Sequence, residues 1–160
     1  MSAITALIQS FKELGIDQQS INELMTHGFC QLETEDKVLC QVVYNDADNT
    51  VFLISPIFLN QKISLGLLKK IMALNLQYNI TKGACLGVNE RANNIELVYG
   101  LSENQIQSMN LTFVINNFVS TAKEIIQVTQ QYTQDENSLP SHLSTRPSTY
   151  SMRFDTQQYQ

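Results

Sequence analysis

The segment ISLGLLKKIMALNLQY, residues 63–78, constrains the fold of this chain more than any other. At about 100° per residue, its apolar side chains form two helical stripes instead of one. The first stripe consists of Ile63, Leu67, Ile71, Leu74 and Tyr78, and the second of Leu65, Leu68, Met72 and Leu76. One apolar stripe is enough to pack a helix against a core, so the second stripe must be buried against something else. We predict one helix over 63–78 that is either buried within its own chain or part of a subunit interface.

Length, composition and charge indicate one domain whose partners are proteins. The chain has 160 residues, of which 43% are hydrophobic, enough for a packed core. Its net charge of -5 disfavours nucleic acid and anionic membranes as partners. The longest mostly apolar run, residues 51–59, is shorter than the roughly 20 residues that span a bilayer, and no signal-like segment opens the chain. We therefore expect no membrane insertion and retention in the compartment of synthesis.

The three cysteines also indicate the compartment in which the protein is expected. Cys30, Cys40 and Cys85 are an odd number of thiols without CxxC spacing, and each lies in an apolar context. This usage is typical of small buried hydrophobes in a reducing cytoplasm.

The pattern of helices and strands predicts an α+β domain. Helix signals occur at 2–14, with Ser2 as N-cap and Gly15 as stop, and at 63–78. The segment 16–27 could be a helical turn or the approach to a strand, and we predict it as loop with some turn. The capping box from Ser102 to Gln105 opens one long helix that fades near Tyr132. Strand signals occur at 28–33, 37–44, 50–58, 82–88 and 95–100. The expected order is helix, three-strand meander, helix, β-hairpin and helix, with a twisted antiparallel sheet.

The strand over 50–58 is apolar on both of its faces. Val51, Phe52, Leu53 and Ile54 do not alternate with polar residues, as they would in a sheet with one wetted side. One face therefore covers the core and the other meets something else. Pro56 predicts an edge position for this strand.

A change of composition divides the chain near Thr133. The last part carries two of the three prolines, many Ser, Thr and Gln residues, and only scattered aromatic residues. We predict a domain over 1–132 and a flexible polar tail over 133–160, which either docks on a partner or has no measurable role.

The sequence offers little equipment for catalysis. No HxxxH, HExxH or paired Cys/His spacing is present, and Gly83 and Gly87 do not form a phosphate loop, so we expect no metal and no cofactor. A Cys85–His27 pair remains open as a nucleophilic arrangement. Excess apolar surface without catalytic groups points to protein binding and to no enzyme activity. A homodimer is the simplest cover for Leu65, Leu68 and Met72 with Leu76, because one patch then covers its own copy.

The chain resembles the class I type III secretion chaperones, also called the Tir chaperone family. The resemblance is carried by MALNL at 72–76, by GACLGV at 83–88, and by the strand, capping box and long helix that follow. It covers about residues 1–130 as architecture and 72–100 as a motif. The polar tail from Thr133 and the turn NER at 89–91 depart from the family pattern.

The resemblance implies a small cytoplasmic bacterial homodimer without ATPase activity. Such a protein binds the N-terminal part of a secreted effector and keeps it extended, soluble and competent for secretion; the secretion ATPase is a further implied partner. Cys85 would lie near the dimer interface with the 63–78 helix. The implied effector-binding residues are Ile4, Ile8, Phe11, Leu32, Leu39, Phe52, Ile54 and Phe58, and the effector could add a strand to a sheet edge.

Two other functions remain open from the sequence. One is a non-catalytic regulatory adaptor of similar fold that binds a folded protein partner. The other is a small thiol enzyme that uses Cys85.

Overall fold

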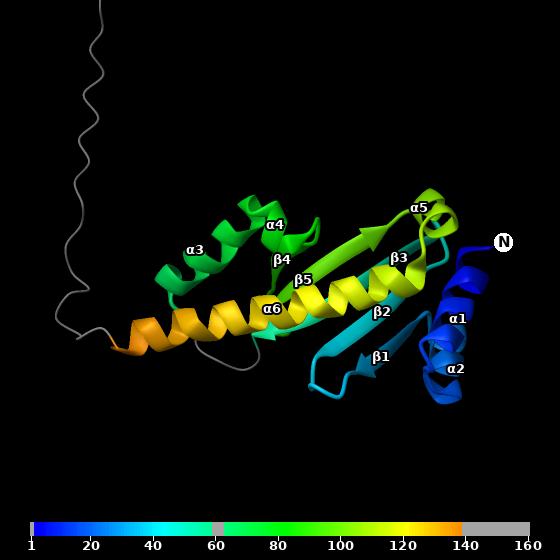
Figure 1. The fold of residues 1–160 in the computed structure, drawn as a ribbon, viewed down its shortest axis with the longest axis horizontal. Helices are drawn as coiled ribbons and strands as arrows, with labels where there is room; N and C mark the ends of the chain where they lie inside the picture. The colour runs from blue at the N-terminus through cyan, green and yellow to red at the C-terminus, as the bar shows by residue number, and fades with distance from the viewer. Residues whose placement is uncertain (1, 59–62, 139–160) are drawn as a thin grey trace, which may run out of the picture.

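A computed structural model describes residues 2–58 and 63–138 (Figure 1). Its helices are α1 (Ala3–Glu13), α2 (Gln18–His27), α3 (Leu65–Ala73), the 3₁₀ helix η1 (Leu74–Leu76), α4 (Tyr78–Thr81), α5 (Glu103–Ser108) and α6 (Leu111–Ser138). Its strands are β1 (Phe29–Glu33), β2 (Leu39–Asn45), β3 (Thr50–Phe58), β4 (Cys85–Asn89) and β5 (Asn94–Leu101). All neighbours in the order β1-β2-β3-β5-β4 are antiparallel. The predicted α+β fold is confirmed.

The N-terminal region contains two helices where the sequence predicted one. The Ser2 hydroxyl accepts a hydrogen bond from the Thr5 N–H at 3.3 Å, so the predicted cap of α1 is confirmed. The loop predicted over 16–27 is wrong, because α2 occupies most of it. The Asp17 carboxylate accepts from the Ser20 N–H at 2.9 Å, and this bond lowers the pKa of Asp17. Gly28 ends α2 at φ 73°, a left-handed conformation that favours glycine.

Strand β3 lies in the centre of the sheet, between β2 and β5, so the edge position predicted from Pro56 is wrong. Proline is tolerated there because it lies beside an irregularity of register between Pro56 and Phe58. Val51, Leu53 and Ile57 are buried, whereas Phe52 and the other alternate residues are only half-buried. The prediction that both faces of this strand are apolar and only one covers the core is confirmed.

Helix α6 runs along one face of the sheet (Figure 1). It buries Phe118, Ala122 and Ile125 in the same core as the inward residues of β3 and β5. We call the sheet face that carries these inward residues the inner face and the opposite one the outer face. Along every strand the two faces alternate, as the period of a β-strand requires.

The single helix predicted over 63–78 is wrong in its second half. Helix α3 ends at Ala73, η1 follows, and Gln77 leaves helical geometry at φ -107° and ψ 82° before α4 begins. The core stripe holds for Leu67, Ile71 and Leu74, which are buried. Tyr78 was predicted on that stripe but is 75% exposed, because the break turns it away from the core.

The single long helix predicted from Ser102 is also interrupted. The capping box of Ser102 and Gln105 is present, but it opens only the short helix α5. The Asn110 side chain then accepts from the Phe113 N–H at 3.0 Å at the start of α6. Helix α6 continues to Ser138, beyond Tyr132. Residues 139–160 of the predicted tail lie outside the described residues, so the division into domain and tail stays a prediction.

Candidate partner-binding surfaces

The outer face of the sheet carries an apolar surface that the described helices leave partly open. We call it the outer patch, and its residues are Phe29, Val43, Phe52, Ile54, Pro56 and Val98. Strand register places Phe29, Val43 and Phe52 in one row across β1, β2 and β3, and Ile54 beside Val98 in the next. Phe29 is 52% exposed. A contiguous apolar surface of this kind is typical of protein-binding sites.

The edge of β1 adjoins the outer patch. The Tyr44 N–H donates to the Gly28 carbonyl at 2.7 Å and the Thr34 N–H donates to the Val38 carbonyl at 3.0 Å, so even-numbered residues face β2. In an antiparallel pair the alternate residues then point outward. The backbone N–H and C=O groups of Phe29, Gln31 and Glu33 therefore face away from the sheet, with no hydrogen-bond partner among the described residues.

The structure divides the predicted effector-binding residues between two regions. Phe52 and Ile54 belong to the outer patch, and Leu39 lies at its end on the same face; Leu32 is on the inner face, facing the helices. The side chain of Phe58 lies outside the described residues.

The predicted residues on α1 lie elsewhere. Helix α1 packs against α2, α5 and α6. Ile4 and Ile8 are half-buried there, and Phe11 is fully buried in the core. Of the three predicted residues on α1, Ile4 and Ile8 therefore offer surface to a partner and Phe11 does not.

The predicted dimer residues form a graded surface on α3 and η1. Leu65 is 68% exposed and Leu76 is 90% exposed, whereas Leu68 and Met72 are half-buried against the core. Cys85 is exposed but belongs to the outer face, where it pairs with Val98 of β5. Four of these residues therefore follow one another along α3 and η1, whereas Cys85 lies on β4, the strand that adjoins η1, and belongs to its outer face.

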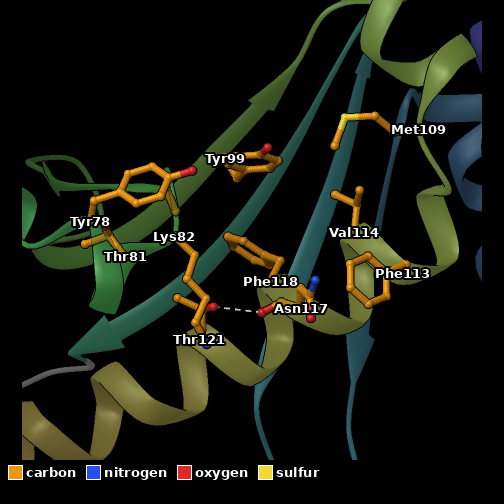
Figure 2. Close-up of a pocket in the computed structure, with 11 residues that line it drawn as sticks. Tyr78, Thr81, Lys82, Tyr99, Met109, Phe113, Val114, Asn117, Phe118 and Thr121 are labelled. Carbon is orange, nitrogen blue, oxygen red and sulfur yellow. Dashed lines mark hydrogen bonds between the residues drawn. The ribbon is translucent and has the colours of Figure 1, made fainter.

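A pocket that the sequence did not reveal lies between α4, β5 and α6 (Figure 2). It has a volume of about 240 Å³ and is walled by Tyr78, Tyr99, Met109, Phe113, Val114 and Phe118. At its polar side the Thr121 hydroxyl donates to the Asn117 carbonyl at 2.8 Å. The pocket exists because the helical path breaks at Gln77 and again before Asn110, and neither break was predicted. Its lining suits an apolar side chain of a partner.

Cys85 and His27, which the sequence left open as a nucleophilic pair, lie far apart in the structure. Burial raises the pKa of Cys30 and of Cys40 to about 12, so both remain protonated near neutral pH. Cys85 is on β4 and His27 precedes β1, at opposite edges of the sheet. Four strand spacings of about 4.8 Å separate those edges by roughly 19 Å, so a Cys85–His27 pair is wrong.

Within the described residues, no helix has the length and apolar character needed to cross a membrane.

Comparison with known proteins gives a match to one family. The sequence model of the Tir chaperone protein (CesT) family matches residues 5–125 of this chain, which is more than half of it. None of the curated proteins compared with the chain matches it.

Two solved structures of protein complexes contain a chain with a similar fold. A chain of the HopA1–SchA chaperone–effector complex matches with a TM-score of 0.56 and 14% identity, over 79% of this chain and 91% of that one. A chain of the ExsC–ExsE complex matches with a TM-score of 0.52 and 10% identity, over 82% of this chain and 90% of that one. At such low identity these matches establish similarity of fold.

Proposed function

The chain belongs to the Tir chaperone protein (CesT) family, and we propose that it is a type III secretion chaperone. Its client is an effector whose N-terminal region it binds in extended form, so that the effector stays soluble and competent for secretion. The single observation that carries this proposal is the combination of an apolar outer patch with the open β1 edge beside it.

Strand addition explains why these two features adjoin. An extended segment that pairs with β1 satisfies the outward backbone groups of Phe29, Gln31 and Glu33 without any sequence requirement. Alternate side chains of the segment then lie on the outer face, where they cover Phe29 and its apolar neighbours. On the helical side of β1, Met25 of α2 is 62% exposed and offers a second apolar contact. The expected client segment is therefore extended, with apolar residues at alternate positions.

Binding of this kind requires no catalysis, no cofactor and no metal. A chaperone of this family acts in the bacterial cytoplasm, where the free thiols of this chain stay reduced. The half-buried Ile4 and Ile8 of α1 offer a further contact for a client that continues around the molecule. The secretion ATPase is a second expected partner.

We also propose a homodimer through the α3 and η1 surface. Leu65 and Leu76 are large apolar side chains that are mostly exposed, and Leu68 and Met72 lie between them in the sequence. Each large side chain that becomes fully covered contributes roughly 1.5 to 3 kcal/mol before association costs. Cys85 would join this interface only if the interface continues around β4 to the outer face.

The decisive experiment is coexpression with the protein encoded beside this chain, followed by hydrogen exchange of the isolated complex. We expect the client's N-terminal segment to lack tertiary structure and the amides of Phe29, Gln31 and Glu33 to become protected. Ile54→Lys should weaken binding at least about tenfold, because it places a charge in the outer patch. Val88→Lys is the matched control, since Val88 is an exposed apolar strand residue outside the patch.

Two outcomes would overturn the proposal. A partner that remains globular when bound would favour a regulatory adaptor. Equal loss of binding in Ile54→Lys and Val88→Lys would remove the outer patch from the site.

A further inference from the structure

The two edges of the sheet differ in their free hydrogen-bonding groups. An edge strand presents alternate N–H and C=O groups that can pair with another strand. Strands β1 and β4 are the two edges here. At β1 the outward groups of Phe29, Gln31 and Glu33 have no partner among the described residues.

At β4 the outward groups of Leu86, between Ala84 and Val88, are both occupied by a side chain. The Asn75 carboxamide donates from Nδ2 to the Leu86 carbonyl at 3.0 Å, and its Oδ1 accepts from the Leu86 N–H at 2.7 Å. These are the two bonds that a residue of a neighbouring antiparallel strand would make. The Ala84 N–H is taken by the Thr81 carbonyl at 2.9 Å. The Ala84 carbonyl and both backbone groups of Val88, on either side of Leu86, have no hydrogen-bond partner among the described residues.

We propose that Asn75 closes the β4 edge and so restricts strand addition to β1, with one extended partner segment per subunit. This rests on the proposed function for its premise that a partner adds a strand. The partner is an extended peptide segment, and Asn75 acts as a specificity-determining residue without touching it.

The surroundings of β4 show why its edge needs closing. Leu76, at 90% exposure, and Val88 lie next to this edge, so an open edge would offer apolar contacts together with free backbone groups. Such an edge would attract a second client segment or the edge of another copy.

Asparagine suits the closing role because its side chain carries one donor and one acceptor on a short stem. Aspartate at this position would still accept from the Leu86 N–H but would repel the Leu86 carbonyl. Alanine would release both groups. Asn75→Ala and Asn75→Asp therefore form a graded pair.

The first part of the test needs no client. We expect the Leu86 amide to exchange about tenfold faster in Asn75→Ala than in the wild-type chain, and Asn75→Asp to be intermediate. Asn79→Ala, an exposed asparagine on α4, is the control with unchanged exchange. Unchanged Leu86 exchange in both Asn75 variants would overturn the closing role.

The second part uses a nitroxide-labelled synthetic peptide of alternating valine and threonine with lysine at both ends. In the wild-type chain we expect it to broaden amide signals of β1 only, and in Asn75→Ala those of β4 as well. Broadening at β4 in the wild-type chain would overturn the proposal. The proposal would also be overturned if the Leu86 amide of a variant exchanges freely while the peptide still does not pair with β4.

The two proposals fail in different ways. If β1 of the wild-type chain takes no strand while Asn75→Ala opens β4 to the peptide, the strand-addition mechanism of the proposed function is wrong and the role of Asn75 stands. Should Asn75→Ala unfold, Asn75→Asp carries both measurements, because it keeps the acceptor for the Leu86 N–H.

Discussion

The ring of Phe52 lies over Gly100 on the outer face of the sheet. The two residues are direct partners in the β3–β5 register, and a Cβ at position 100 would come within 3.2 Å of the ring. The glycine therefore allows the ring to lie flat against the neighbouring strand in the middle of the outer patch. This contact fixes the shape of the surface to which we assign client binding.

Gly100→Ala should alter the outer patch without unfolding the chain. The new methyl group forces the half-exposed Phe52 ring to shift by a few tenths of an ångström, while the strand gains a residue with better β-propensity. We expect changed ring signals of Phe52 in NMR spectra and an unfolding free energy within about 1 kcal/mol of wild type. Gly87→Ala is the control, because a Cβ there meets nothing within 4 Å. Unchanged Phe52 signals in Gly100→Ala would contradict the contact.

The three cysteines should differ sharply in reactivity. Burial raises the pKa of Cys30 and Cys40 to about 12, and the thiolate is the reactive form, so both should resist an aromatic disulfide reagent near neutral pH. We expect one fast equivalent per chain from Cys85 and the other two only in denaturant. The Cys85→Ser variant should lose the fast phase. If Cys85 lies in a dimer interface, its reaction should slow as protein concentration rises.

The Ser55 hydroxyl should be dispensable for stability. Ser55 is fully buried on the inner face of β3, and its Oγ has no hydrogen-bond partner among the described residues. Because an unpaired buried hydroxyl costs free energy, Ser55→Ala should leave the unfolding free energy unchanged or raise it by about 1 kcal/mol. In Thr121→Val the buried hydroxyl is bonded, so we expect a loss of about 1 kcal/mol. Urea denaturation measures the unfolding free energy of both variants. A clear loss in Ser55→Ala would mean that the Ser55 hydroxyl has a hydrogen-bond partner.

Local patterns were enough to predict the five strands and the helical segments that contain α1, α3 and α6. The strand signals over 37–44 and 95–100 and the caps at Ser2 and Ser102 act within a few residues, so the sequence displays them directly. Helix α2 was missed although Asp17 and Gly28 mark its two ends, because its few apolar residues gave a weak stripe. The start of α6 at Asn110 was hidden by the strong helical pattern on both sides.

The breaks that shape the candidate sites depend on distant contacts. Asn75 reads as an ordinary helical residue, and its bonds to Leu86 exist only after β4 has folded beside η1. The placement of Cys85 on the outer face likewise depends on the register with Val98. Register follows from the whole sheet, so neither feature can be derived from local periodicity.

The two stripes of α3 should differ in their contribution to stability. Ile71 is fully buried in the core, whereas Leu65 is 68% exposed. Ile71→Ala should lower the unfolding free energy by about 2 to 5 kcal/mol, because it removes buried methyl groups and leaves a cavity. Leu65→Ala should change that of the isolated subunit by no more than about 0.5 kcal/mol. Comparable losses of unfolding free energy in both variants, measured at low protein concentration, would mean that both faces of α3 are buried within one chain.

The same exposure pattern selects the substitutions that test the homodimer. Met72→Glu and Leu68→Glu should split it, but both side chains also pack against the core, so a loss of folding could mimic dissociation. Leu76→Glu is cleaner, because Leu76 is 90% exposed and contributes little to the core. By light scattering we expect the wild-type chain at twice its 18.1 kDa mass and Leu76→Glu at the single-chain mass with unchanged thermal stability of the subunit. Met25→Glu controls for added charge on an exposed apolar residue of α2, which packs beside β1 at the opposite edge of the sheet. If the Leu76, Leu68 and Met72 variants all keep the doubled mass, the interface lies on another face. A wild-type chain at the single-chain mass would mean that the second stripe of α3 binds the client instead of a second copy.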